Sequence, residues 1–176
     1  MKQNNILQVG NPILRTKASP IAEELFGSSH LVDLAGTLIN IMSIENGIGL
    51  AAPQIGISKR AIVFGFNDLH LKPHLPNIPC TILFNPSFEP TSDALVEDYE
   101  GCLSVGTLRA KVPRYQSIYF SGYDIEGKKI EKEVSGLHAR VFQHEYDHLD
   151  GILFLDRVID YHSLGFHDEL KKAGVF

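Results

Sequence analysis

Apolar residues recur at helical spacing in an early segment of the chain. Over residues 31–42 they occupy positions i, i+3, i+4, i+7, i+10 and i+11, which is typical of one buried helix face. We therefore expect an amphipathic helix here, ending near Asn46 and Gly47. The segment before it contains the turn-forming pairs Asn11-Pro12 and Ser19-Pro20, so an irregular N-terminal arm should precede the helix.

A second helical stripe lies late in the chain and includes two histidines. Leu137, Val141, His144 and His148 fall at i, i+4, i+7 and i+11, so the two imidazoles continue an apolar face. With a Ser N-cap at position 135 and a Gly stop at position 151, the pattern predicts a helix over residues 135–151.

Several shorter patterns predict β-strands. Apolar or alternating runs occupy residues 61–64, 81–84, 117–120 and 129–134. Asn85-Pro86 should end the second strand, and a turn near residues 124–127 should pair the last two. Residues 67–79, rich in Pro and His, predict a loop, and residues 167–172 a short polar helix.

Strands flanked by two substantial helices are typical of an α+β fold. We expect small mixed or antiparallel sheets packed around a central helix that carries H-E-x-x-H, with the amphipathic helix nearer the N-terminus. A length of 176 residues suits a single domain over residues 1–176. The net charge of −5 argues against specific nucleic-acid binding.

Composition and termini also bear on the compartment. The first eight residues contain no apolar segment, so we expect no signal peptide, and no apolar run approaches membrane-spanning length. Two cysteines do not make a disulfide framework. These features favour a cytoplasmic protein that does not bind a membrane.

The chemistry of the late helix centres on His144, Glu145 and His148, which form the pattern H-E-x-x-H. Histidines four residues apart on a helix can bind one metal ion, and Glu145 could accept a proton from a water at that ion. The motif alone also fits an ordinary polar helix face. Two unpaired imidazoles on a core-facing stripe would be costly, however, and a shared metal satisfies both.

A catalytic metal site usually has three protein ligands, so a third must be sought. Cys80 lies among apolar strand residues and is interpreted as core. Cys102 follows Gly101, which allows close backbone approach, so its thiolate could reach a metal. The residues themselves leave open that Cys102 is a buried structural thiol.

Two zinc-peptidase patterns offer other third ligands. One requires a histidine where this chain has Phe154, which cannot bind a metal. The other requires a glutamate about twenty residues downstream. Glu169 stands near that distance, but its neighbours are polar and charged, which favours a solvated helix face.

The glycine-rich segment over residues 47–54 loosely matches a dinucleotide-binding fingerprint. That fingerprint must follow a strand and open a helix, whereas here it follows a helix and runs into Pro53. We interpret it instead as an extended segment whose backbone, near Ile48 and Gly49, could pair with a peptide. Gln54 would then offer an amide donor near the metal. The alternative is a simple helix-to-strand connection.

Three motifs in this order closely resemble those of the peptide deformylase family. They are Gly47-Ile48-Gly49-Leu50-Ala51-Ala52-Pro53-Gln54, Glu100-Gly101-Cys102-Leu103-Ser104 and Gln143-His144-Glu145-Tyr146-Asp147-His148. The resemblance extends over nearly the whole chain. It implies a hydrolase that removes the N-formyl group from the initiator methionine of new proteins and releases formate.

The resemblance also implies roles for individual residues. Cys102, His144 and His148 would bind the metal, and Glu145 would serve as general base and acid. Gln54 and the backbone N–H of Leu103 would hold the developing oxyanion. The residues implied to bind substrate are Ile48, Gly49, Gly101 and Arg109 along the peptide, and Leu137 and Val141 in the methionine pocket.

The resemblance further implies one divalent metal ion and specific partners. Fe²⁺ is the expected native ion, with Ni²⁺, Co²⁺ or Zn²⁺ as alternatives. Partners would be N-formyl-methionyl nascent chains and, transiently, the ribosome. The chain ends soon after Leu170, so a ribosome-binding C-terminal tail is not carried over.

One loop departs from the family pattern. Many members have proline, often followed by glycine, where this chain has Gly106 and Thr107. The family's peptide contacts at this loop are therefore not carried over to this chain. Two other classes remain to be tested: a general metallopeptidase, and a structural metal module with four closed ligands.

Overall fold

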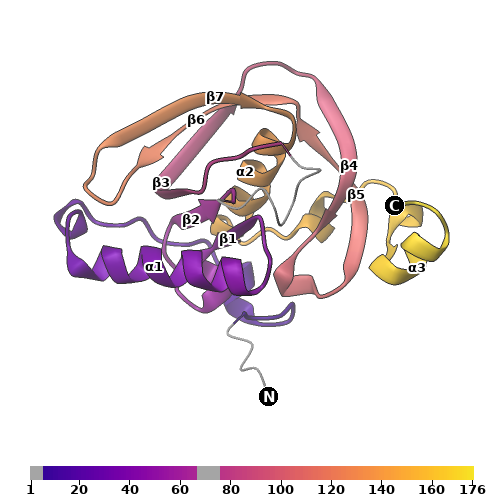
Figure 1. The fold of residues 1–176 in the computed structure, drawn as a ribbon, viewed down its shortest axis with the longest axis horizontal. Coiled ribbons are helices and arrows are strands. Elements are labelled where there is room, and N and C mark those ends of the chain that lie inside the picture. Colours follow the sequence, from indigo (N-terminus) through magenta and orange to yellow (C-terminus); the bar gives the residue numbers. More distant parts are fainter. Residues whose placement is uncertain (1–5, 67–75) are drawn as a thin grey trace.

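Two antiparallel sheets and three α-helices make up the architecture of the computed structural model, which describes residues 6–66 and 76–176 (Figure 1). The larger sheet has the order β1 (Gly49–Ala51), β2 (Ala61–Phe64), β3 (Thr81–Pro90), β6 (Ser117–Tyr123) and β7 (Lys129–Ser135). The smaller has the order β4 (Leu95–Gly101), β5 (Leu108–Tyr115) and β8 (Gly165–Phe166). The helices are α1 (Ser29–Ile44), α2 (Gly136–Leu149) and α3 (His167–Lys172). Short 3₁₀ helices are η1 (Pro12–Arg15), η2 (Glu23–Leu25), η3 (Ala52–Ile55), η4 (Leu103–Val105), η5 (Phe154–Arg157) and η6 (Tyr161–Ser163).

The four residues of β2 are all buried because each face of this strand meets a helix. Ile62 and Phe64 point into the core cluster shared with α2, while Ala61 and Val63 point into the cluster shared with α1. Side chains alternate across a strand, so an uninterrupted apolar run is what a strand buried on both faces requires.

The predicted amphipathic helix is confirmed as α1, whose buried face includes Leu31, Leu34 and Leu38. The side chain of Ser28 caps it by accepting from the Leu31 N–H at 3.4 Å. The chain leaves the helix through Asn46, which adopts a left-handed φ of 54°. Asparagine tolerates this conformation, so the predicted end of the helix is correct.

The predicted central helix is confirmed as α2. It packs against β1, β2 and β7 of the larger sheet and against β5 of the smaller one, so it lies between the two sheets (Figure 1). Ser135 stands at the N-cap position, although its side chain makes no capping hydrogen bond. Gly151 follows the helix with φ of 73°, the left-handed conformation expected of a C′ glycine.

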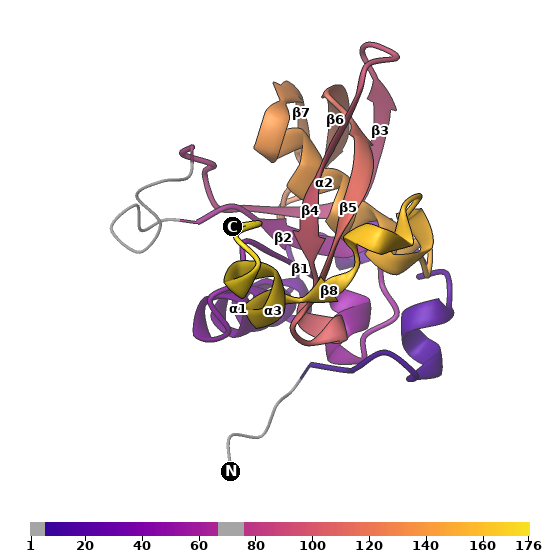
Figure 2. The ribbon, with the colours of Figure 1, turned by 90° about the vertical axis from the view of Figure 1, so that its right-hand side faces the viewer.

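The β4–β5 hairpin is absent from the strands predicted by sequence patterns. Most of β4 is exposed, so its residues show little of the apolar alternation that identifies a half-buried strand. Its register comes from pairing with β5, from Leu95 opposite Tyr115 to Gly101 opposite Arg109. β8 pairs with β5 at the edge of this sheet, and α3 follows β8 directly (Figure 2).

The prediction that Asn85-Pro86 ends a strand is wrong, because β3 continues to Pro90. Asn85 adopts a φ of 48°, and the pairing of β3 with β6 shifts register between Phe84 and Ser87. This irregularity accommodates the proline without ending the strand. Asn85 also exchanges two hydrogen bonds of 2.8 Å with the backbone of Ile21, which anchors the N-terminal arm.

The remaining predictions concern shorter segments. The paired strands β6 and β7 and the closing helix α3 are confirmed. Most of the predicted loop over 67–79 lies outside the described residues. In residues 6–66 and 76–176, no helix combines the length and hydropathy needed to cross a bilayer.

A candidate metal and catalytic site

The end of β4 meets the middle of α2 at a cluster of one thiol and two imidazoles. Cys102 follows the last residue of β4, and its Sγ lies 3.3 Å from Nε2 of His148. His144 and His148 lie one helical turn apart, with ring centroids separated by 5.1 Å. One ligand atom from each of the three residues falls within 4.8 Å of the others. The third ligand left open by sequence patterns is therefore placed at Cys102.

The donor set fits a divalent transition-metal ion. Two imidazole nitrogens and one thiolate suit several such ions. Ligand atoms on one tetrahedral ion lie roughly 3.3–3.6 Å apart, given ordinary metal–sulfur and metal–nitrogen bond lengths. The observed 3.3 Å between Cys102 and His148 agrees with this spacing. Burial lowers the pKa of His148 well below its ordinary value, which keeps its imidazole neutral and able to bind metal.

Glu100 fixes the orientation of the first histidine. Its Oε2 lies 2.9 Å from Nδ1 of His144. Burial opposes ionisation of Glu100, but hydrogen bonds from His144 and Arg114 outweigh that effect and hold its pKa below the usual range. An ionised carboxylate only accepts, so Nδ1 carries the proton and Nε2 is left free to bind a metal.

Glu100 is itself held by two arginines. Arg114 donates to both of its oxygens at 3.0 Å, and Arg140 donates to Oε1 at 2.7 Å. Arg114 also pairs with Asp147 at 2.6 Å, and Asp147 pairs with Arg157 at 2.8 Å. A continuous chain of ion pairs therefore runs from the metal ligands to the surface. Pairing and hydrogen bonding are what make such buried charges tolerable.

The carboxylate of Glu145 lies in the same site, adjacent along α2 to the first ligand. Its Oε2 is buried and has no hydrogen-bond partner among the described residues. Burial raises the pKa of Glu145 to about 7. A group with such a pKa can both accept and release a proton near neutral pH, as general acid–base catalysis requires.

Gln54 and Leu103 supply hydrogen-bond donors beside the cysteine. The Gln54 side-chain oxygen accepts from the Ala51 N–H at 2.8 Å, which turns its amide nitrogen toward Cys102 Sγ at 3.5 Å and Ser104 Oγ at 3.1 Å. Leu103 opens η4, and the first N–H groups of a helix have no partner within that helix.

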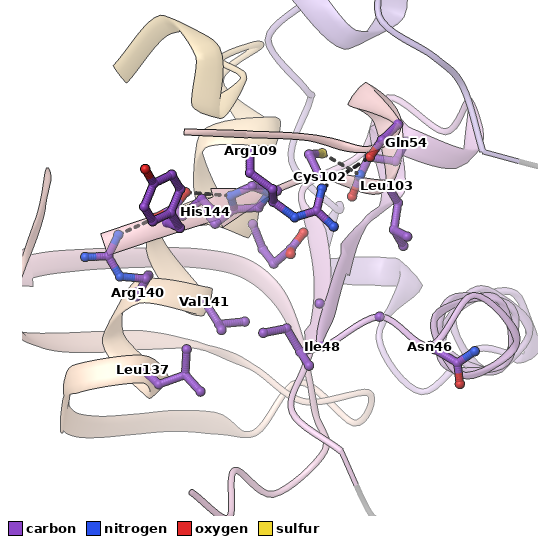
Figure 3. Close-up of a pocket in the computed structure, with 17 residues that line it drawn as sticks. Asn46, Ile48, Gln54, Cys102, Leu103, Arg109, Leu137, Arg140, Val141 and His144 are labelled. Carbon is purple, nitrogen blue, oxygen red and sulfur yellow. Dashed lines mark hydrogen bonds and ion pairs between the residues drawn. The ribbon is translucent and has the colours of Figure 1, made fainter. Parts of the chain in front are cut away.

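A cavity of about 330 Å³ opens at this cluster (Figure 3). It is lined by every site residue predicted from the sequence except His148, which is 1% exposed. Leu137, Val141 and Ile48 gather on one side in Figure 3, with Cys102, Gln54 and Leu103 on the other. The three motifs, far apart in sequence, thus surround one cavity.

Residues 3–163 match the protein family described as polypeptide deformylase. The chain belongs to the peptide deformylase family. It is therefore a hydrolase that removes the formyl group from N-terminal formylmethionine.

Curated relatives and solved structures agree with this assignment. Peptide deformylase 2 of Pseudomonas syringae pv. tomato is 45% identical, over 93% of this chain and 92% of that protein. Peptide deformylase 1 of Bordetella pertussis is 44% identical, over 94% and 93%. A Met-Ala-Ser-bound class I type b deformylase from Acinetobacter baumannii superposes with a TM-score of 0.82 at 34% identity, over 87% of this chain and 96% of that one. The deformylase from Thermotoga maritima gives 0.77 at 32% identity, over 88% and 97%.

The structure also places the residues that competed for the metal of this deformylase. Glu169 lies on exposed α3 and pairs with Lys172 at 2.7 Å, as expected for a solvated helix face. Cys80 packs against the core shared with α1 rather than in the ligand cluster. Phe154 stacks on His144 with ring centroids 6.3 Å apart, so it forms an apolar wall instead of a ligand.

Gly106, where the sequence departs from the pattern expected of deformylases, adopts a backbone conformation that proline could not adopt. Gly106 has φ of 68° and ψ of −133°, a combination that requires glycine. Proline is confined to φ near −65°, so it could not adopt this conformation. The Gly106 carbonyl accepts from Arg109 at 3.4 Å, and Arg109 also lines the cavity.

Sequence patterns missed the residues that support the ligands of this deformylase. Neither the motif that contains Glu100 nor any other pattern in the sequence predicts a role for Glu100, Arg114 or Arg140. Tyr99, which also lines the cavity, makes an edge-to-face contact with Phe176 at 5.0 Å. The signal that the sequence did offer is the position of Arg140 four residues before His144, on the same side of the helix, where a charge needs a partner.

Proposed function

We propose that Cys102, His144 and His148 hold one divalent metal ion and that Glu145 moves the protons of the reaction. The observation that carries this proposal is the cluster of three ligand atoms within 4.8 Å of one another. Beside it lies the Glu145 carboxylate, whose Oε2 has no hydrogen-bond partner among the described residues. When bound, the ion supplies Lewis-acid chemistry, which activates a water and polarises the formyl carbonyl.

Glu145 accepts a proton as the water oxygen bonds to the formyl carbon. It then donates this proton to the amide nitrogen while the carbon–nitrogen bond breaks. Formate and a free N-terminal amine are the products. A pKa of about 7 suits both halves of this cycle.

Gln54 and the Leu103 N–H stabilise the negative charge that develops on the formyl oxygen. The hydrogen bond from the Ala51 N–H fixes the Gln54 amide before substrate binds, so little reorganisation is needed. Removing one such donor typically costs about 10²–10³ in turnover.

The peptide binds in extended form between two backbone segments. On one side, Gly49 begins β1 and Ile48 precedes it. Among the described residues β1 is an edge strand of the larger sheet, so its outer edge can pair with an added strand. On the other side stand Gly101 and Arg109. The Met-Ala-Ser peptide bound to the Acinetobacter relative supports a site of this kind.

Leu137 and Val141 form the pocket for the methionine side chain together with Ile48. All three line the apolar side of the cavity. Leu137 and Val141 lie on the same face of α2 as His144. Burying an unbranched thioether there is favourable because it removes apolar surface from water.

Fe²⁺ is proposed as the native metal, with Ni²⁺, Co²⁺ or Zn²⁺ as functional replacements. The mixed imidazole and thiolate donor set supports any of these ions. Metal analysis of protein prepared without oxygen tests the identity. Iron in nearly every site would support the proposal, and zinc alone under those conditions would oppose it.

The substrate also suggests where the enzyme works. Formylated N-termini arise during translation, so we propose cytoplasmic residence and a transient contact with the ribosome. The net charge of −5 favours a brief encounter over sustained RNA binding. Co-sedimentation with translating ribosomes that persists at high salt would contradict the transient character.

Activity on three substrates tests the proposed roles together. Formyl-methionyl peptides should be cleaved, whereas acetyl-methionyl peptides and casein should not. Casein digestion would favour a general metallopeptidase. A bound metal with no activity on any substrate would favour a structural metal module.

A further inference from the structure

Arg140 stands at the apolar end of the cavity, although its side chain is charged. Its guanidinium donates to the Glu100 carboxylate at 2.7 Å and to the carbonyls of Val112 and Val96 at 2.8 and 2.6 Å. The side chain is only 9% exposed. Three hydrogen bonds to two strands of the smaller sheet therefore hold this arginine in one position.

A second cavity lies behind it. This space, about 120 Å³ in volume, is bounded by the β4–β5 hairpin and the first turns of α2. Leu137 and Arg140 line both cavities. These two side chains, one helical turn apart on α2, therefore form the partition between them. Figure 3 shows Arg140 beside Leu137 and Val141, with its guanidinium directed away from Ile48.

We propose that Arg140 determines specificity by closing the far end of the pocket for the first side chain of the substrate. This inference rests on the proposed placement of methionine against Leu137 and Val141. The cavity behind Arg140 is then a continuation of that pocket, which the arginine keeps out of reach. Side chains of methionine length fit in front of it, and longer unbranched side chains meet its anchored stem.

The three hydrogen bonds of Arg140 explain why its side chain can limit the length of the pocket. A mobile aliphatic side chain would yield to a longer substrate at the cost of a rotamer change. Moving Arg140 would instead break three hydrogen bonds at once: one to the buried Glu100 carboxylate and those to the carbonyls of Val112 and Val96. Loss of hydrogen bonds by buried polar groups is costly, so the arginine resists displacement.

The test compares two formyl peptides that differ only in the first residue, methionine or 2-aminooctanoic acid, which has a longer unbranched side chain. The measured ratio is kcat/KM for the longer substrate divided by kcat/KM for the methionyl substrate. We expect Arg140→Ala to raise this ratio by roughly tenfold. Both substrates are measured on one preparation, so incomplete metal loading or folding cancels in the ratio. Should R140A not fold, R140Q, which shortens the side chain but keeps an amide donor, carries the same test.

Arg157→Ala is the matched control. Arg157 belongs to the same chain of ion pairs but lines neither cavity, so its ratio should stay within about twofold of the parent. Calorimetric titration with the unformylated peptides should show the same change in preference without turnover. An unchanged ratio in both R140A and R140Q would overturn the proposal, as would an equal rise in R157A.

The outcome can be separated from failure of the proposed function. A parent enzyme that cleaves formyl-methionyl peptides while R140A shows no altered preference would contradict only the role of Arg140. Full activity of a Glu145→Ala variant would contradict the proposed catalytic site itself.

Discussion

The Glu145 carboxylate fills the space that a side chain on Gly49 would need. A Cβ built on Gly49 would lie 2.2 Å from Oε1 of Glu145, far inside van der Waals contact. The two residues come from different elements, β1 and α2, which pack directly against each other. Gly49 therefore makes room for the proposed base, in addition to its proposed backbone contact with the peptide.

Gly49→Ala should lower kcat by roughly 10²-fold, because a displaced base no longer reaches the reacting water. Steady-state kinetics with a formyl-methionyl peptide measures this. Gly36→Ala is the control, since an added Cβ at that exposed position of α1 meets nothing within 4 Å. The control should keep full activity and gain about 0.5–1 kcal/mol of stability. Equal kcat values for the two variants would contradict the proposed crowding.

Glu145→Ala should keep its metal but lose turnover by about 10²–10⁴-fold, the usual contribution of general acid–base catalysis. Metal content and kcat are measured on the same sample. Glu97→Ala, at an exposed position of β4, serves as the control and should behave as the parent. Near-normal turnover by E145A would remove Glu145 from the mechanism.

Cys102→Ala should release the metal, because only two imidazoles would remain to hold it. Competition with a chromophoric chelator gives the affinity, and we expect a loss of more than about 10²-fold. Glu169→Gln tests the alternative glutamate ligand and should leave the affinity unchanged, since Glu169 pairs with Lys172 on the surface. The reverse pattern would favour the peptidase-type ligand set.

Arg114→Met should destabilise the fold by about 3–5 kcal/mol, because it leaves Glu100 and Asp147 buried without their shared partner. Denaturant unfolding measures this change in the free energy of unfolding. Arg15→Met is the matched control, since Arg15 and Asp156 form an exposed pair worth at most about 1 kcal/mol. Comparable losses in both variants would show that burial of the ion-pair network contributes little.

Metal affinity gives an independent measure for Arg114→Met. A carboxylate that has lost its main donor should orient His144 less firmly. Changes of this kind typically weaken metal binding by about 10–100-fold. Unaltered affinity in folded R114M would show that Arg140 alone suffices to hold Glu100.

Both long helices could be predicted from the sequence because their signals are local. In α1 and α2, apolar spacing and end residues specify the buried face within one segment. The motif around His144 and His148 was also local, since one helical turn brings the two rings together. The β4–β5 hairpin could not be found in this way, because mostly exposed strands are defined by their partner.

The continuation of β3 past Pro86 was hidden for a related reason. A proline in the sequence usually marks the end of a strand. Here Asn85 adopts a positive φ, the register shifts between Phe84 and Ser87, and pairing with β6 then continues. The hydrogen bond with Glu100 that orients His144 could not be predicted, because the two residues are far apart in the sequence. Glu100 and His144 are 44 positions apart, and no local pattern indicates which carboxylate will reach which imidazole.

The amino-acid sequence by itself determined the helices, the order of three motifs and, through them, the family and its reaction. Those properties depend on residues close together along the chain. Only the tertiary structure decided that hydrogen bonds among Glu100, Arg114 and Arg140 join the ligand helix to the smaller sheet. It also decided that Arg140 lies between two cavities. Such contacts join β4, β5 and α2, and the physical reason is that side-chain distances between separate elements exist only after packing has set them.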